Sequence, residues 1–190
     1  MNLATVILNN VFLDGLFSMN HSGLQKPHAY IGLVNPKSPT NVGMVMRAAG
    51  CYEADAVFYS GVRFERARKF ATDTKNAQSK IPLMHAENLP SAPVAGAKLV
   101  AIELIEGAVP LMDFTHPENA YYIFGPEDGS LKSEILDHCD HVVYIPTIGC
   151  MNLAATVHVV LYDRMSKSGR AVIEQRPVAD NRDVNNKIRI

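Results

Sequence analysis

The sequence IPTIGCMNLAAT, residues 145–156, joins the end of an apolar strand to an apolar helix through a tight polar turn. Asn152 is the first side chain of the expected helix, and asparagine is among the residues preferred at a helix N-cap. The helix continues with apolar residues on all sides, which predicts burial against a sheet or another subunit. Two glycine-containing segments lie upstream, NVGMVMR at 41–47 and FGPEDGSL at 124–131. Together the three segments form the candidate functional region of the chain.

Strands and helices alternate along the sequence before and within this stretch. Runs rich in apolar, β-branched and aromatic residues predict strands at 30–34, 56–59, 81–84, 99–102, 121–124 and 142–145. Periodic apolar patterns predict helices at 41–52, 87–97, 133–138 and 152–165. Such an alternation is typical of an α/β fold with a mostly parallel sheet covered by helices on both faces.

Length and composition favour a single domain. The chain has 190 residues, 47% of them hydrophobic, which is enough for one sizeable core. We expect the domain at residues 29–168, after an N-terminal extension at 1–28 and before a polar C-terminal tail at 169–190. The apolar N-terminal stretch lacks a basic start and is interrupted by Asp14, unlike a signal peptide. Because no later apolar run is long enough to span a bilayer, we expect a soluble cytoplasmic protein.

Several common types of site are missing from the sequence. The three cysteines show no C-x-x-C spacing, which favours reduced thiols over a disulfide framework or a zinc site. No G-x-G-x-x-G or G-x-x-x-x-G-K-[ST] motif is present, so a dinucleotide dehydrogenase or a P-loop enzyme is disfavoured. No HExxH pair occurs among the seven histidines, and we expect no metal. What remains is a set of glycine-containing turns at the carboxyl ends of strands, where open α/β sheets bind ligands.

The charges are segregated although the formal net charge is only -1. Residues 63–80 carry six Lys and Arg against two Asp and Glu, and residues 164–190 carry seven against three, so each stretch has an excess of +4. Clustered cations attract a phosphate backbone even in a chain that is nearly neutral, although solvated helix faces would look the same. The candidate RNA-binding residues are Arg63, Arg66, Arg68 and Lys69.

Segments 41–47, 124–131 and 145–156 resemble, in order and kind, the three signature motifs of the SpoU/TrmH branch of the SPOUT RNA methyltransferases. The resemblance covers about residues 30–168. It implies a SPOUT-type sheet with a C-terminal trefoil knot, whose loops bind S-adenosylmethionine largely through backbone groups. It further implies transfer of a methyl group to a ribose 2'-hydroxyl of RNA by a homodimer. The small size of the chain favours tRNA over rRNA as the substrate.

The resemblance also implies roles for individual residues. The cofactor slot would be lined by Glu103, Leu104, Gly125, Ile145, Gly149, Cys150, Met151, Asn152 and Leu153. The catalytic group would consist of Arg47, Asn41, Glu127 and Asn152. Arg47 would grip a phosphate and stabilise negative charge on the 2'-oxygen, because a guanidinium is a poor general base. Glu127 would orient Arg47, Asn41 or a loop amide, and Asn152 would cap the last helix and hold the loops together.

The sequence departs from the family pattern at three positions. Glu53 stands where many members have glycine, and Cys150 and Ala154 replace common serines. These changes bear on cofactor affinity more than on the class of reaction. Two alternatives remain open at this point: a SPOUT-like module that binds RNA without catalysis, and an RNA methyltransferase that acts on a base nitrogen.

Overall fold

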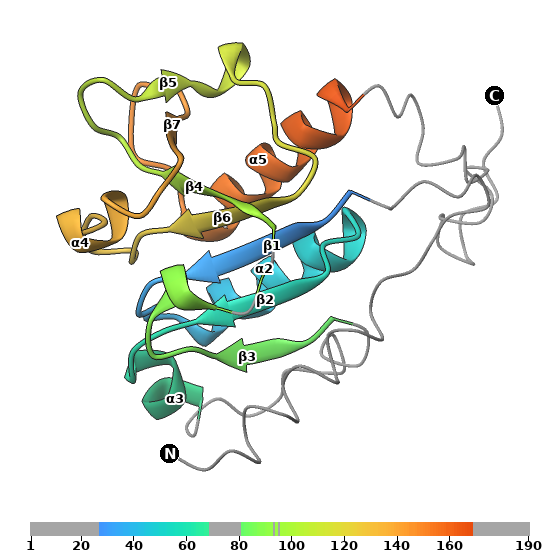
Figure 1. Ribbon diagram of the computed structural model, residues 1–190. Helices are drawn as coiled ribbons and strands as arrows, with labels where there is room; N and C mark the ends of the chain where they lie inside the picture. The colour runs from blue at the N-terminus through green and yellow to red at the C-terminus, as the bar shows by residue number, and fades with distance from the viewer. Residues whose placement is uncertain (1–26, 69–80, 93, 95, 169–190) are drawn as a thin grey trace, which may run out of the picture.

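The fold is a seven-stranded parallel sheet in the computed structural model, which describes residues 27–68, 81–92, 94 and 96–168 (Figure 1). The strands are β1 Ala29–Leu33, β2 Ala56–Tyr59, β3 Leu83–His85, β4 Lys98–Ile102, β5 Val109–Pro110, β6 Ala120–Phe124 and β7 His141–Tyr144. Their order across the sheet is β3-β2-β1-β6-β4-β7-β5, and every neighbouring pair is parallel. The α/β fold with a parallel sheet is thereby confirmed. The expected N-terminal extension, apart from its last two residues, and the C-terminal tail lie outside the described residues.

Four helices and two 3-10 turns lie between or after the strands within the described part of the chain. They are α2 Pro39–Cys51, α3 Arg63–Arg68, η2 Leu89–Ser91, η3 Leu111–Asp113, α4 Ser133–Leu136 and α5 Leu153–Lys167. The helix predicted at 87–97 is wrong, because the described residues of this segment form only the short 3-10 turn η2. Pro90 and Pro93 interrupt this segment, and proline cannot donate the backbone hydrogen bond that a helix interior needs.

The sheet separates two hydrophobic clusters. α2 and α5 pack against each other along one face, with Val45 and Val160 fully buried there (Figure 1). The other face is covered by shorter pieces, among them η2 and the segment around α4. Residues of β6 alternate between the clusters, as a strand's two-residue repeat requires: Tyr122 faces α2 and α5, and Tyr121 faces the other side. One side of α5 is buried against the sheet and α2, as predicted, while Tyr162 on this helix is exposed in the single chain.

Glycine is required in β1 by the neighbouring strand. A Cβ atom on Gly32 would lie 2.7 Å from the hydroxyl oxygen of Tyr121 on β6. This close approach lets a tyrosine ring lie fully buried against the backbone of a central strand.

The turn after α2 contains one of the three departures from the family pattern. Glu53 has a φ angle of +55°, in the left-handed region that favours glycine. The position that is commonly glycine in the family therefore has a backbone conformation that suits glycine. Glu53 adopts this conformation in the turn that leads from α2 into β2.

Polar side chains of α5 hold the long connection between β4 and β6 against the domain. Arg164 donates hydrogen bonds to the carbonyl oxygens of His28, Pro117 and Glu118. His116, from the same connection, lies between the Tyr122 hydroxyl at 2.6 Å and the Asp163 carboxylate at 2.9 Å. Burial lowers the pKa of His116, and the Asp163 carboxylate opposes that shift only in part. The imidazole is therefore neutral at pH 7 and bridges the connection to α5.

Candidate functional site

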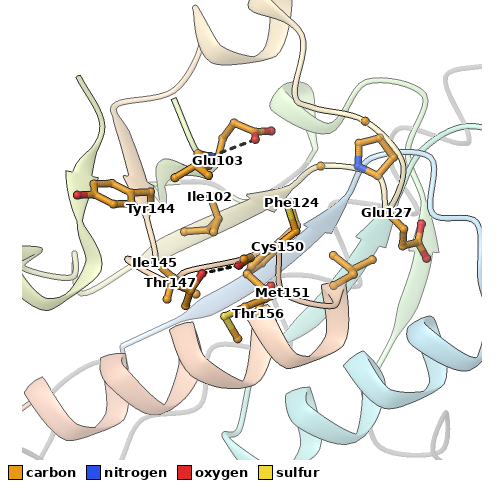
Figure 2. Close-up of a pocket in the computed structure, with 16 residues that line it drawn as sticks. Ile102, Glu103, Phe124, Glu127, Tyr144, Ile145, Thr147, Cys150, Met151 and Thr156 are labelled. Carbon is orange, nitrogen blue, oxygen red and sulfur yellow. Dashed lines mark hydrogen bonds between the residues drawn. The ribbon is translucent and has the colours of Figure 1, made fainter. Parts of the chain in front are cut away.

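A pocket lies at the carboxyl ends of β4, β6 and β7 (Figure 2). The space between its walls is about 830 Å³, including the part open to solvent. Its walls come from the segment after β4, the turn after β6 and the loop between β7 and α5. The lining residues are Ile102, Glu103, Leu104, Phe124, Gly125, Pro126, Glu127, Gly129, Tyr144, Ile145, Thr147, Gly149, Cys150, Met151, Leu153 and Thr156.

Eight of the nine residues predicted to line a cofactor slot line this pocket; Asn152 is the ninth. Tyr144, Thr147 and Thr156 line it too and were not predicted. Thr147 and Thr156 lie inside or at the end of the 145–156 segment, so the motif itself was a usable signal for both. Both hydroxyls donate within this segment, from Thr147 to the Gly149 carbonyl at 2.7 Å and from Thr156 to the Asn152 carbonyl at 2.9 Å.

Three of the four predicted catalytic residues form one chain of hydrogen bonds. Asn152 donates from Nδ2 to Oδ1 of Asn41 at 3.1 Å, and Asn41 donates from Nδ2 to Oε1 of Glu127 at 3.0 Å. Glu127 also accepts from the backbone amides of Lys37 at 2.8 Å and Ser38 at 3.1 Å. These hydrogen bonds join residues that lie far apart in the sequence: the loop before α2 and its first turn, the turn after β6 and the start of α5.

The direction of this hydrogen-bond chain is fixed at both ends. Oδ1 of Asn152 accepts from the amides of Ala154 at 2.9 Å and Ala155 at 3.4 Å, so it caps α5 as predicted. Its Nδ2 must then donate, and the donors run toward the Glu127 carboxylate, which only accepts. Burial raises the pKa of Glu127, but the hydrogen bonds from Asn41 and the two amides outweigh it, so that its pKa lies below the ordinary value. The carboxylate is therefore charged at neutral pH.

The start of α2 is set by a signal that the prediction of a helix at 41–52 did not use. Ser38 accepts a hydrogen bond from the Asn41 amide at 3.3 Å, and Pro39 is the first helical residue. Serine at the N-cap followed by proline is a common helix start. The cap places Asn41 in the first turn of α2, with its side chain toward Glu127.

Glu103 holds the turn after β6 in place. Its carboxylate accepts from the Leu131 amide at 2.6 Å and from its own neighbour, the Leu104 amide, at 3.1 Å. A Cβ atom on Gly125 would lie 3.2 Å from Oε2 of Glu103. Glycine at this position lets the carboxylate pack against the turn, of which Gly125, Pro126, Glu127 and Gly129 line the pocket.

Arg47 does not join the hydrogen-bond chain. It lies exposed on α2 and makes no hydrogen bond or ion pair with any residue that the structure describes. Of the three partners considered for Glu127, the structure has Asn41 and the loop amides and not Arg47. The guanidinium of Arg47 is available to a ligand.

The predicted basic segment is described only in part. Arg63 forms a two-point ion pair with Asp128, at 2.8 and 2.9 Å, and Arg66 is exposed. The side chain of Arg68 and all of Lys69 lie outside what the structure describes. Among the described residues, no group of three or more His, Cys, Asp or Glu could hold a metal ion, and no helix is suited to crossing a membrane. Cys51, Cys139 and Cys150 are all free thiols.

Comparison with known proteins identifies the family. The model of the SpoU rRNA methylase family matches residues 28–162, most of the chain. The chain belongs to this family. Among curated proteins, it is 27% identical over 169 residues to 23S rRNA (guanosine-2'-O-)-methyltransferase RlmB of Acinetobacter baylyi, an alignment that covers 83% of this chain and 65% of that protein. The chain thus spans just under two thirds of the length of this SpoU-family relative.

Solved structures of SpoU-type proteins share the fold. The tRNA modifying enzyme TrmH/SpoU of A. aeolicus superposes with a TM-score of 0.64 at 16% identity, over 76% of this chain and 77% of that one. The SpoU methyltransferase AviRb of Streptomyces viridochromogenes, solved in complex with AdoMet, superposes with a TM-score of 0.62 at 18% identity, over 80% and 62% of the two chains.

Proposed function

We propose that this SpoU-family protein is an S-adenosylmethionine-dependent methyltransferase that acts on a ribose 2'-hydroxyl of RNA. The observation that carries the proposal is the hydrogen-bond chain Asn152–Asn41–Glu127, which joins all three motif segments at the edge of one pocket. The name of RlmB, a guanosine-2'-O-methyltransferase, supports the same reaction for the related part of this chain.

The pocket fits the cofactor. Apolar side chains from three segments face it, including Ile102, Ile145 and Leu153, and these suit the adenine ring. Gly149 leaves room as well, since a Cβ atom there would meet nothing within 4 Å. We assign the binding of S-adenosylmethionine to Glu103, Leu104, Gly125, Ile145, Gly149, Cys150, Met151, Asn152 and Leu153. Bound there, the cofactor supplies a methyl group on a sulfonium, which needs alignment with the acceptor more than covalent help.

The chain's own residues supply position and charge. Asn152, Asn41 and Glu127 fix the loops around the acceptor, because their mutual hydrogen bonds leave each side chain one orientation. The exposed guanidinium of Arg47 grips an RNA phosphate and stabilises negative charge on the 2'-oxygen, whose proton leaves to a phosphate or to water. Arg63, Arg66, Arg68 and Lys69 guide the RNA toward the pocket.

The C-terminal trefoil knot is part of the proposal. Support comes from the strand order, in which β6 lies between β1 and β4 while β7 lies beyond β4. The chain leaves β7 and returns to the α2 side of the sheet as α5, past the connection between β4 and β6, to which Arg164 and Lys167 of α5 are bonded. We assign the knotted domain to residues 29–168, flanked by the extension at 1–28 and the tail at 169–190.

We further propose a cytoplasmic homodimer that acts on tRNA rather than rRNA. Exposed Met44 on α2 and Tyr162 on α5 lie on neighbouring helices and offer an apolar contact to a second copy. Free thiols suit a reducing compartment. The tRNA preference is supported by the named activity of the A. aeolicus TrmH/SpoU enzyme, of which the alignment covers 77%.

Calorimetric titration with S-adenosylhomocysteine tests the pocket. We expect saturable binding that is lost in Gly149→Val. Gly149 lines the pocket and a Cβ atom there meets nothing within 4 Å, so we expect the variant to obstruct the pocket without disturbing the fold. No binding by folded protein, with or without RNA, would favour an RNA-binding module without catalysis.

Nucleoside analysis of methylated RNA tests the reaction. A 2'-O-methyl nucleoside is the expected product, whereas a methylated base would show that the acceptor is a ring nitrogen. Arg47→Ala should abolish transfer while S-adenosylhomocysteine still binds, because Arg47 makes no bond that holds the pocket. Loss of cofactor binding in this variant would contradict the role assigned to Arg47.

A further inference from the structure

Asp128 lies between two cations beside the pocket. Its carboxylate is bonded to Nη1 and Nη2 of Arg63 at 2.8 and 2.9 Å, and its Oδ2 lies 3.6 Å from Nζ of Lys37. The three groups come from the turn after β6, the start of α3 and the loop after β1. The neighbouring contact fixes the positions of Lys37 and Asp128, because Glu127, the residue before Asp128 in the turn, accepts a hydrogen bond from the backbone amide of Lys37.

This ion pair is accessible to a ligand. The exposed fractions of the side chains are 51% for Asp128, 29% for Arg63 and 64% for Lys37. The hydrogen bonds from Arg63 lower the pKa of Asp128, so the carboxylate stays charged throughout the neutral range. Arg66, from the same short helix as Arg63, is exposed as well. A chain of phosphates that reaches the pocket from this side meets these cations and one fixed carboxylate.

A carboxylate and a phosphate bind arginine through the same pair of parallel N–H groups. Asp128 occupies the Nη1–Nη2 edge of Arg63 and offsets the charge of the guanidinium, so a phosphate reaches this edge only by displacing the carboxylate. An RNA phosphate at this place gains little from Arg63 unless it displaces Asp128. An RNA that is already held by other contacts, with a phosphate opposite Arg63, can displace Asp128 and form the two-point contact with the guanidinium.

We propose that Asp128 is a specificity-determining residue, which keeps Arg63 from binding phosphates of unselected RNA and releases it to the phosphate of a correctly docked substrate. The inference rests on the proposed RNA-modifying function. Asp128 acts through Arg63 and touches neither the cofactor pocket nor the reacting atoms.

The test is the salt dependence of RNA binding by the full chain. Fluorescence anisotropy with a mixed-sequence single-stranded RNA of about 20 nucleotides gives the affinity at several salt concentrations between 50 and 200 mM. Asp128→Asn should bind this RNA at least twofold more tightly at 50 mM salt. Its plot of log affinity against log salt should be steeper by about 0.7, because one more phosphate is neutralised. That slope corresponds to an extra loss of affinity of about 2.6-fold across this range.

Two further variants separate Arg63 from a general change in charge. Asp113→Asn makes the same change at an exposed carboxylate that forms no ion pair with described residues, and it should leave the slope unchanged. Arg63→Gln combined with Asp128→Asn should abolish the extra slope. An unchanged or weaker affinity in Asp128→Asn, an equal effect in Asp113→Asn, or an extra slope that survives in the double variant would each overturn the inference.

Failure here is distinguishable from failure of the proposed function. Titration with S-adenosylhomocysteine reports on the pocket and does not depend on Arg63 or Asp128. Circular dichroism of each variant checks the fold, which an exposed ion pair stabilises only slightly. Cofactor binding with an unaltered RNA salt slope in Asp128→Asn overturns the specificity role alone. Absence of cofactor binding in the wild type contradicts the methyltransferase proposal alone.

Discussion

Asn41→Asp removes the central donor of the hydrogen-bond chain with almost no change in volume. The new oxygen replaces Nδ2 and faces Oε1 of Glu127 at 3.0 Å. The lost bond is to a charged group and contributes about 1.5–3 kcal/mol. Two charges at this distance repel by about 5.5 kcal/mol at an effective dielectric constant of 20, and solvent screening reduces this because both side chains are partly exposed. We expect a loss of about 3–5 kcal/mol of unfolding free energy at pH 8.

The same pair predicts a distinctive pH dependence. Repulsion of this size raises the pKa of one carboxyl above its unfolded-state value, so the folded variant binds a proton that the unfolded chain releases. Protonated, the new carboxyl donates to Glu127 and restores the hydrogen bond. The variant should therefore recover most of its lost stability as pH falls from 8 to 5, and lose it again as pH rises through the raised pKa.

Urea unfolding at pH 5 and pH 8, paired with cofactor-product titration, measures both effects. Asn88→Asp is the matched control, because Asn88 is exposed and its side chain makes no capping bond. The control should stay within about 0.5 kcal/mol of the wild type. An Asn41→Asp variant that matches the wild type at pH 8, or whose stability difference does not change with pH, would refute the proposed link between Asn41 and Glu127.

Three further changes test other parts of the structure. Glu103→Gln replaces the carboxylate that holds the turn after β6 with an amide, and calorimetry should show S-adenosylhomocysteine binding about tenfold more weakly. The control Glu106→Gln, at an exposed glutamate, should leave that affinity unchanged. Burial lowers the pKa of His116, so near pH 6 the folded state binds fewer protons than the unfolded chain. Thermal scans should therefore show the stability of the protein decreasing as the pH falls below about 6.5, and this decrease should be less steep in His116→Gln. Gly61 has a φ angle of +74°, and a Cβ atom there would lie 2.3 Å from Oδ1 of Asn35, so Gly61→Ala should lower the free energy of unfolding in urea by about 2–4 kcal/mol. Gly107→Ala should lower it by only about 1 kcal/mol, because φ is +84° there but the space around the Cβ position is open.

Much of the sheet follows from local sequence. The strands predicted at 30–34, 56–59, 99–102, 121–124 and 142–145 each lie within one residue of the observed ones. Their side chains are apolar because both faces of a parallel sheet are covered, and this leaves a clear signal in a single segment. Where the signal was weak, in the proline-rich stretch at 87–97, the predicted helix does not form.

The motif segments are visible in the sequence, but the contacts between them are not. Asn152 and Asn41 are separated by 111 positions, and Glu127 lies 86 positions after Asn41. They meet because β6 pairs with both β1 and β4, and β4 pairs with β7, which brings the segments after β1, β6 and β7 to one edge of the sheet. No local pattern specifies that strand order, since it depends on long-range pairing.

The sequence by itself determined the class of fold, the position of most strands, the N-cap at Asn152 and, through its motifs, the family. The tertiary structure alone decided which polar group meets which. In the folded protein, Glu127 accepts hydrogen bonds from the side chain of Asn41 and from two backbone amides. Arg47 is exposed, and Arg63 forms an ion pair with Asp128. The physical reason is that helices and strands place side chains at fixed intervals along the chain, so burial produces a periodic pattern of apolar residues in the local sequence. A hydrogen bond between distant side chains depends instead on how the whole sheet is assembled.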